Sequence, residues 1–293
     1  MNATAPKVVS SRPVLRGYEQ TVLCFFLLLA VAGFWRSISF AGEIALLLSP
    51  LPVWWLCRLE EQRGAGWARV LREWISLAAI PLAYWSLELF AKPSVAVSVQ
   101  DSWVLWDRQI LNAAGMRRIF EALGPVIPVL LETAYLLLYA IPPISLGLLY
   151  AAGERRQAPR FLEVLFLGTL TAYILILVVP TQSPRVAFAG QDLPAYNGFP
   201  RSLNVWLLDH LDISTSVFPS GHVAVAFSCA FGLFRAVPRR PRVWMPVLIT
   251  ACLVFLATIY GRYHYAVDGL ASIAIALVAW GLADRIWPDD DAV

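Results

Sequence analysis

The sequence predicts an all-α protein, a polytopic bundle of membrane-spanning helices. Of its 293 residues, 59% are hydrophobic and 15% charged, and its mean hydropathy is +0.64. Soluble domains have about 45–50% apolar and about 25% charged residues, so both values point to the bilayer. Twelve Trp and ten Tyr add to this, because amphipathic rings gather at the depth of the lipid headgroups. We therefore expect an integral membrane protein with no soluble domain.

Apolar runs recur along the chain, and a spanning helix needs about 20 mostly apolar residues. The first run contains Ala30-Val-Ala32, which is similar to a signal-peptidase site, but we expect an uncleaved anchor. Roughly eight spans follow from the pattern, so both termini should lie on one side of the membrane. The runs cover residues 20–35, 42–57, 73–91, 126–151, 161–180, 219–236, 243–260 and 265–286.

The distribution of Lys and Arg among the loops predicts the orientation. If the N-terminus is cytoplasmic, the inside segments carry fifteen basic residues and the outside segments eight, which together account for all 23. Short cytoplasmic loops retain basic residues, so this excess predicts that both termini are cytoplasmic. Arg239-Arg-Pro-Arg242 is the strongest single signal. The long loops 92–125 and 181–218 then lie outside, and each contains a short amphipathic segment suited to the membrane interface.

A first motif, Pro219-Ser-Gly-His222, opens the sixth predicted span. Pro is favoured at a helix start, since its missing N–H would be unpaired there anyway. The free N–H groups of Ser220, Gly221 and His222, with the positive end of the helix dipole, form a site for an anion. Gly221 lets an anion approach the backbone closely. We therefore expect Ser220 and Gly221 to bind substrate through their amides.

A second motif, His264-Tyr-Ala-Val-Asp268, enters the eighth span at the same outer surface. Residues four apart share one face of a helix, so Asp268 could hold one imidazole nitrogen of His264 and raise the basicity of the other. That is what a nucleophilic histidine needs. Arg185 and Arg262 emerge on the same side, and Arg is the side chain best shaped for a phosphate.

These segments resemble the type 2 phosphatidic acid phosphatase superfamily, whose motifs include PSGH and a later HxxxD. The resemblance covers about 165–285, with 73–151 supplying two earlier core spans. It implies a six-helix catalytic core at 73–286, preceded by a tail and two added spans at 1–72 and followed by a cytoplasmic tail at 287–293. It also implies His264 as nucleophile, Asp268 as its partner, and His222 as general acid.

Departures from the family pattern narrow the resemblance. The family's third motif often carries Ser-Arg where this chain has Ala257-Thr258, and Arg262 takes the place of that Arg. The first motif is reduced to Pro184-Arg185. This pattern is similar to the branch of inositol phosphorylceramide and sphingomyelin synthases, which are phosphotransferases. Two alternatives stay open: a plain phosphatase of phosphatidic acid or an isoprenyl diphosphate, and a catalytically silent lipid-binding protein.

Other ligands and partners find little support in the sequence. Four cysteines (24, 57, 229 and 252) lie in apolar runs without CxxC spacing, so we expect neither a disulfide nor a metal site. No basic run suggests nucleic acid, and a bis-histidine haem site would not explain the Ser-Gly before His222 or the acid after His264. We expect no metal and no cofactor, with a lipid phosphate as substrate and membrane lipids as partners. The oligomeric state is not indicated.

Three further polar residues have open roles at this stage. Glu132 lies near the outer end of its span, on a face shared with Tyr135 and Tyr139, and either lines the site or is a hydrogen-bonded structural group. His210 is interpreted as a polar residue of a lid-like loop. Asp107 is interpreted as a solvated acid at the membrane interface.

Overall fold

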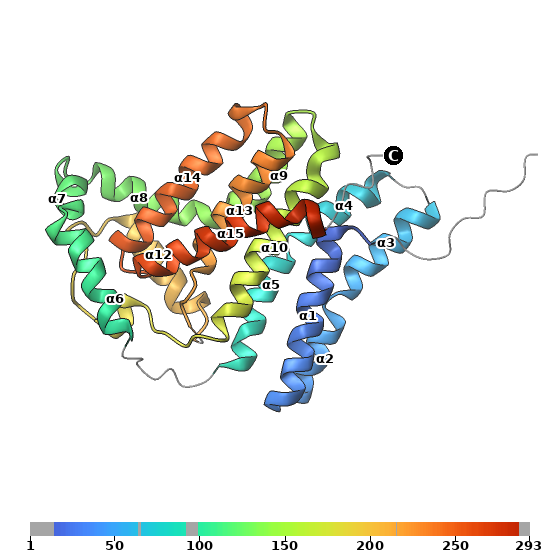
Figure 1. Cartoon of the computed structure of the whole chain (residues 1–293), viewed down its shortest axis with the longest axis horizontal. Helices are drawn as coiled ribbons and strands as arrows, with labels where there is room; N and C mark the ends of the chain where they lie inside the picture. Colours follow the sequence, from blue (N-terminus) through green and yellow to red (C-terminus); the bar gives the residue numbers. More distant parts are fainter. Residues whose placement is uncertain (1–14, 64–65, 92–98, 215, 287–293) are drawn as a thin grey trace, which may run out of the picture.

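In the part of the chain that the structure describes, all the regular elements are helices (Figure 1). The computed structural model describes residues 15–63, 66–91, 99–214 and 216–286, so the expected tail at 287–293 lies outside the described residues. The prediction of an all-α membrane bundle is confirmed. Six described helical segments are long and apolar enough to cross a membrane: 17–36, 40–60, 126–151, 155–176, 241–260 and 266–286.

The core is built around α13 (Gly221–Ala236), which packs against α10 (Ala158–Ile176), α14 (Pro241–Tyr260) and α15 (Ala266–Ile286). Small residues let α10 and α13 approach closely. A Cβ on Gly168 would come within 2.2 Å of the Ser228 hydroxyl, and one on Gly232 within 2.7 Å of the Phe161 carbonyl oxygen. Lipid tails are as apolar as the helices, so membrane helices associate through such close packing.

Two of the eight predicted spans differ from simple long helices. α13 has only 16 residues, or about 24 Å, which is shorter than the roughly 30 Å hydrocarbon core. The run 73–91 is divided among α4 (Gly66–Ser76), α5 (Ala79–Ser86) and the 3₁₀ helix η1 (Leu87–Phe90). Pro81 follows the break and has no N–H to bond to the carbonyl of Leu77. The backbone turns tightly there, and Ile80 N donates to Leu77 O at 3.1 Å.

A second break interrupts the segment 126–151. It consists of α8 (Val126–Leu137), the 3₁₀ helix η3 (Leu138–Ala140) and α9 (Ile141–Ala151). The adjacent residues Pro142 and Pro143 begin α9 and cannot complete the hydrogen bonds of the preceding turn. Irregular backbone at membrane depth is tolerated where it lines a cavity.

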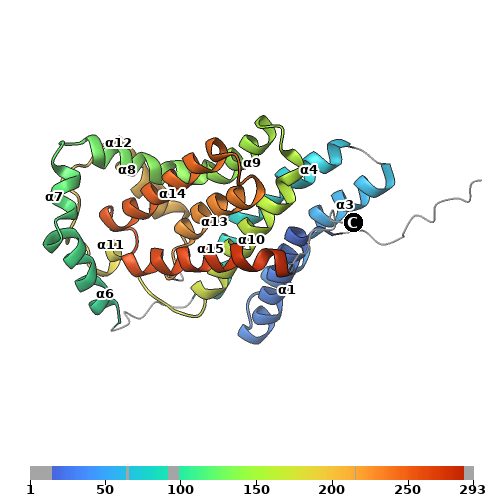
Figure 2. The same cartoon turned by 45° about the horizontal axis from the view of Figure 1, so that its top comes forward.

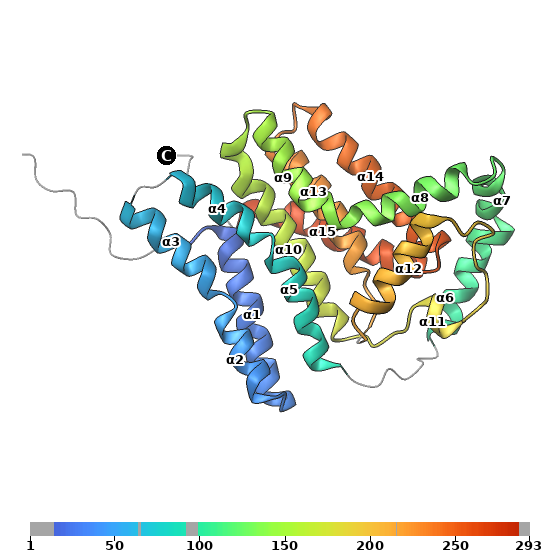
Figure 3. The same cartoon turned by 180° about the vertical axis from the view of Figure 1, so that it is seen from behind.

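The first two predicted spans lie together on one flank of the bundle. α1 (Gly17–Arg36) packs against α2 (Phe40–Leu48) and α10, and α3 (Leu51–Arg63) continues the second span (Figures 1 and 3). Buried charges tie this flank together: Arg72 on α4 bonds Glu60 at 2.6 Å and also pairs with Glu19. Arg72 is 4% exposed.

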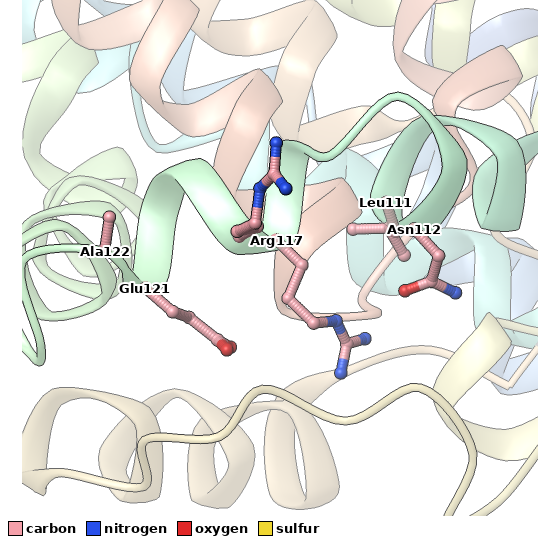
Figure 4. Close-up of a pocket in the computed structure, with 6 residues that line it drawn as sticks. Leu111, Asn112, Arg117, Glu121 and Ala122 are labelled. Carbon is pink, nitrogen blue, oxygen red and sulfur yellow. The ribbon is translucent and has the colours of Figure 1, made fainter.

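The segments expected outside the membrane gather at the opposite end of the molecule, where α6 (Val99–Arg108), the π-helix η2 (Gln109–Ala113) and α7 (Met116–Glu121) follow one another (Figure 2). Arg117 donates to Leu193 O at 2.9 Å, and Glu121 accepts from Ala195 N at 3.1 Å. These bonds fasten α7 to the second outer loop. A shallow groove of about 520 Å³ lies beside them (Figure 4).

Candidate active site

The two predicted catalytic histidines lie side by side. His222 is in the first turn of α13, and His264 is in the short loop between α14 and α15. Nδ1 of His222 is 3.4 Å from Nε2 of His264, and the ring centroids are 5.7 Å apart. The packing of α13 between α14 and α15 therefore joins two motifs that are 42 residues apart in the sequence.

Asp268, in the first turn of α15, faces the other nitrogen of His264. Its Oδ2 is 3.3 Å from Nδ1, and the carbonyl oxygen of Val217 is 3.1 Å from the same atom. Both groups are acceptors, so the hydrogen-bond pattern assigns the ring proton to Nδ1. The lone pair is then on Nε2, which faces His222. Tyr265 N donates to Asp268 Oδ2 at 3.0 Å and fixes the carboxylate.

The His264 ring is almost enclosed, with 5% of the residue exposed. Burial lowers its pKa to about 4, against the opposing effects of the Asp212 charge and the Val217 carbonyl. A base with this pKa is unprotonated at neutral pH. Nε2 of His264 is therefore available as a nucleophile without a preceding loss of a proton.

The start of α13 is fixed mainly by contacts to α15. Ser220 is the N-cap, and its hydroxyl accepts from Val223 N at 3.3 Å. Its own N–H donates to Asp268 O at 3.2 Å, so this amide is already used, unlike in the sequence-based expectation. Of the three predicted anion-binding amides, those of Gly221 and His222 remain. A Cβ on Gly221 would lie 2.9 Å from the ring of Tyr173, which explains the glycine.

Arg262 is fully buried beside the His264 loop. Its Nη1 donates to Asp107 Oδ2 at 2.8 Å, and Asp107 Oδ1 accepts from Ala266 N at 2.9 Å. Nε and Nη2 of Arg262 find no partner within the described residues. Arg262 also has a φ of 63°, a left-handed conformation that is unusual for a residue other than glycine and often marks a functional site.

The interpretation of Asp107 as a solvated acid is wrong, because it is 1% exposed and paired with Arg262. Burial raises the pKa of Asp107 to about 6, and the Ala266 N–H and the Arg262 charge oppose that rise. The sequence alone does not show whether a charged side chain on an interfacial helix faces the protein interior or the solvent. α6 packs on α15, and this contact turns Asp107 toward the site.

Arg185 lies close to Arg262 through the backbone, but its guanidinium points elsewhere. It is on the short helix α11 (Pro184–Ala187), and its N–H donates to Arg262 O at 3.0 Å. Its Nη1 is 2.5 Å from Asp209 Oδ1 on α12 (Phe199–Leu211). The guanidinium would have to leave Asp209 to reach a phosphate beside His264.

Glu132 belongs to a buried hydrogen-bonded network. Its carboxylate accepts from Arg201 at 2.9 Å, from Tyr263 at 2.6 Å and from Asn204 at 2.9 Å. These bonds hold α12 and the loop that carries His264 against α8. Of the two roles considered for Glu132, lining the site or serving as a hydrogen-bonded structural group, the structure therefore shows the second. His210 stacks on Trp206 at the exposed surface of α12, and its Nδ1 is 2.8 Å from Trp206 O.

A cavity of about 450 Å³ opens beside His222. Its walls are mainly apolar and include both proline breaks described above, at Pro81 and at Pro142-Pro143. Three tyrosine rings, Tyr135, Tyr139 and Tyr84, surround His222 with centroid separations of 5.2, 6.1 and 6.4 Å. The remaining lining residues that matter for the site are Leu77, Ile80, Leu138, Asp212, Gly221 and Val225.

The chain is a helical membrane bundle with two histidines and an aspartate at one end of its central helices. This combination places it in the class of membrane phosphatase-like proteins. The chain matches the sequence profile of the PAP2 superfamily over residues 104–282, and it belongs to that superfamily. It is also 30% identical to a PA-phosphatase related-family protein of Dictyostelium discoideum over 126 residues, which is 40% of this chain and 22% of that protein. No solved structure matches the chain.

Several residues of the site are not singled out by the motifs. Arg201 and Tyr263 belong to the site because they bond to Glu132. Tyr84 and Asp212 belong to it because they line the cavity. The prolines are a signal that was available, because Pro-interrupted hydrophobic segments in membrane proteins often border a binding site. Asp212 had no comparable signal, since it is one acid among several in a long outer loop.

Proposed function

We propose that the protein is a membrane-bound lipid phosphatase or phosphotransferase that works through a phosphohistidine on His264. The observation that supports this most directly is the orientation of the His264 ring. Asp268 and Val217 O occupy the side of Nδ1, while Nε2 faces His222 across 3.4 Å. Nucleophile, orienting acid and acid–base partner are thus neighbours, with His264 in contact with both of the others.

In this mechanism Nε2 of His264 attacks phosphorus, and the bond from phosphorus to the alcohol oxygen breaks. The proton on His222 passes to the departing oxygen as the new N–P bond forms. In the second half, water or an alcohol attacks the phosphohistidine from the same side, returns a proton to His222 and releases His264. Arg262 and the amides of Gly221 and His222 stabilise the equatorial oxygens, and Arg185 joins them when its guanidinium leaves Asp209.

The substrate in this proposal is a lipid phosphate ester. The cavity beside His222 is walled by apolar side chains, and apolar walls favour a hydrocarbon chain over a polar metabolite. Within the superfamily, the reduced first motif Pro184-Arg185 favours the inositolphosphotransferase-like branch, in which an alcohol replaces water as acceptor. The active site would then lie on the extracytoplasmic side.

The experiment is to incubate purified protein with a lipid phosphate in detergent, with EDTA, with and without inositol. Turnover with EDTA present is expected, because no group of three His, Cys, Asp or Glu in the described part of the chain could hold a metal ion. A new lipid formed only with inositol supports a phosphotransferase, and free phosphate alone supports a phosphatase. Full activity of His264→Ala would exclude the phosphohistidine.

A further inference from the structure

A solvent-exposed carboxylate that the proposed mechanism does not use lines the cavity. Asp212 follows the end of α12 and lines the cavity together with His222. Its Oδ1 accepts from the Tyr84 hydroxyl and from Ile213 N at 3.1 Å. No donor within the described residues bonds to Oδ2. Asp212 thus presents one free carboxylate oxygen beside the predicted catalytic histidines.

The backbone around Asp212 is held firmly against α5 and η1. Trp85 Nε1 donates to Leu211 O at 3.1 Å, and Ser214 donates to Glu88 through its N–H at 2.7 Å and its hydroxyl at 2.6 Å. Ordered contacts on both sides of Asp212 fix the direction of its side chain. The Asp212 carboxylate is therefore held in place by its surroundings, unlike a carboxylate on a loop without such contacts.

The cavity lies on the leaving-group side of the proposed reaction. Its wall includes His222 and Gly221 but not His264. In phosphoryl transfer the attacking and leaving atoms are roughly in line with phosphorus, so a group opposite His264 must be the departing or incoming oxygen. The lipid alcohol that carries this oxygen therefore occupies the cavity, with its chain among Leu77, Ile80 and Leu138.

A carboxylate at this position selects among lipid alcohols. It repels an anionic leaving group, such as the phosphate released from an isoprenyl diphosphate. It attracts a hydrogen-bond donor, and a bond from a hydroxyl or an amide N–H to a charged oxygen is stronger than one between neutral groups. A fully esterified glycerol has no such donor next to its phosphoester oxygen.

We propose that Asp212 binds a hydroxyl or amide N–H located next to the phosphoester oxygen of the lipid alcohol, and that Tyr84 positions this carboxylate. The inference rests on the proposed function. It deepens that function by restricting the substrate to lipid alcohols that carry a second hydrogen-bond donor.

The test compares two substrates that differ in one group. One is 1-oleoyl-2-hydroxyglycerol 3-phosphate, and the other is its 2-methoxy analogue, which keeps the chain and the phosphate but has no donor. The full chain in detergent should show kcat/KM higher by about tenfold or more for the hydroxy compound. Asp212→Ala should remove this preference, so that the two compounds are turned over with similar kcat/KM values.

A matched control is Asp192→Ala, which removes another carboxylate of the same outer loop, bonded to Arg108 and away from the cavity. This variant should keep the preference. Equal turnover of the two substrates by the wild type would overturn the role of Asp212 and leave the proposed function standing. Loss of both activities in Asp212→Ala would also contradict it. No turnover of either substrate by the wild type would overturn the proposed function and this inference together.

Discussion

Replacing Asp268 by Asn should slow phosphoryl transfer without abolishing it. The His264 proton on Nδ1 has two acceptors, Asp268 Oδ2 at 3.3 Å and Val217 O at 3.1 Å, and the substitution removes only the charged one. A hydrogen bond to a charged group contributes roughly 1.5–3 kcal/mol. Since each ~1.4 kcal/mol is tenfold in rate, kcat should fall roughly ten- to 150-fold. His264→Ala should instead eliminate turnover, because the nucleophile is gone.

The assay is release of phosphate from a lipid phosphate in detergent, measured for the wild type, Asp268→Asn and His264→Ala. Thermal unfolding of each purified variant, followed by Trp fluorescence, checks that the bundle is intact. If Asp268→Asn were as inactive as His264→Ala, the Val217 carbonyl would not maintain the tautomer. If kcat were unchanged, Asp268 would not support His264 at all.

Three further outcomes are expected. Burial lowers the pKa of His264 to about 4, so kcat/KM should fall as the pH drops below about 4, where Nε2 becomes protonated; a rise in kcat/KM below pH 4 would contradict this. Glu132→Leu should cost about 3–5 kcal/mol of unfolding free energy, because the Arg201 charge stays buried without its partner. Adding Arg201→Met should recover most of this loss. A denaturant titration of each variant measures both changes. In a cysteine-free background, Ser202→Cys should react with an impermeant maleimide in intact cells and Pro238→Cys only after permeabilisation; the reverse pattern would place the site in the cytoplasm.

The sequence alone determined the class of fold and the family. Composition and the lengths of apolar runs are summed over many residues, so single errors change them little. Pro219-Ser-Gly-His222 and His264-Tyr-Ala-Val-Asp268 also identified the superfamily, because a motif records chemistry that needs those residue types at that spacing. The two interrupted spans were missed as interruptions, although Pro81, Pro142 and Pro143 were visible in the sequence.

Only the tertiary structure decided which polar groups meet. Asp107 and Asp212 are both acids in predicted outer loops, yet the first is buried against Arg262 and the second lines the cavity beside His222. Likewise Ser220 N–H is used by Asp268 O and not left for an anion. Hydrophobic pattern and helix ends are local properties, which the chain encodes within one or two turns. The partner of a polar side chain depends on how separate helices pack, and contacts between residues distant in sequence are fixed only when the bundle forms.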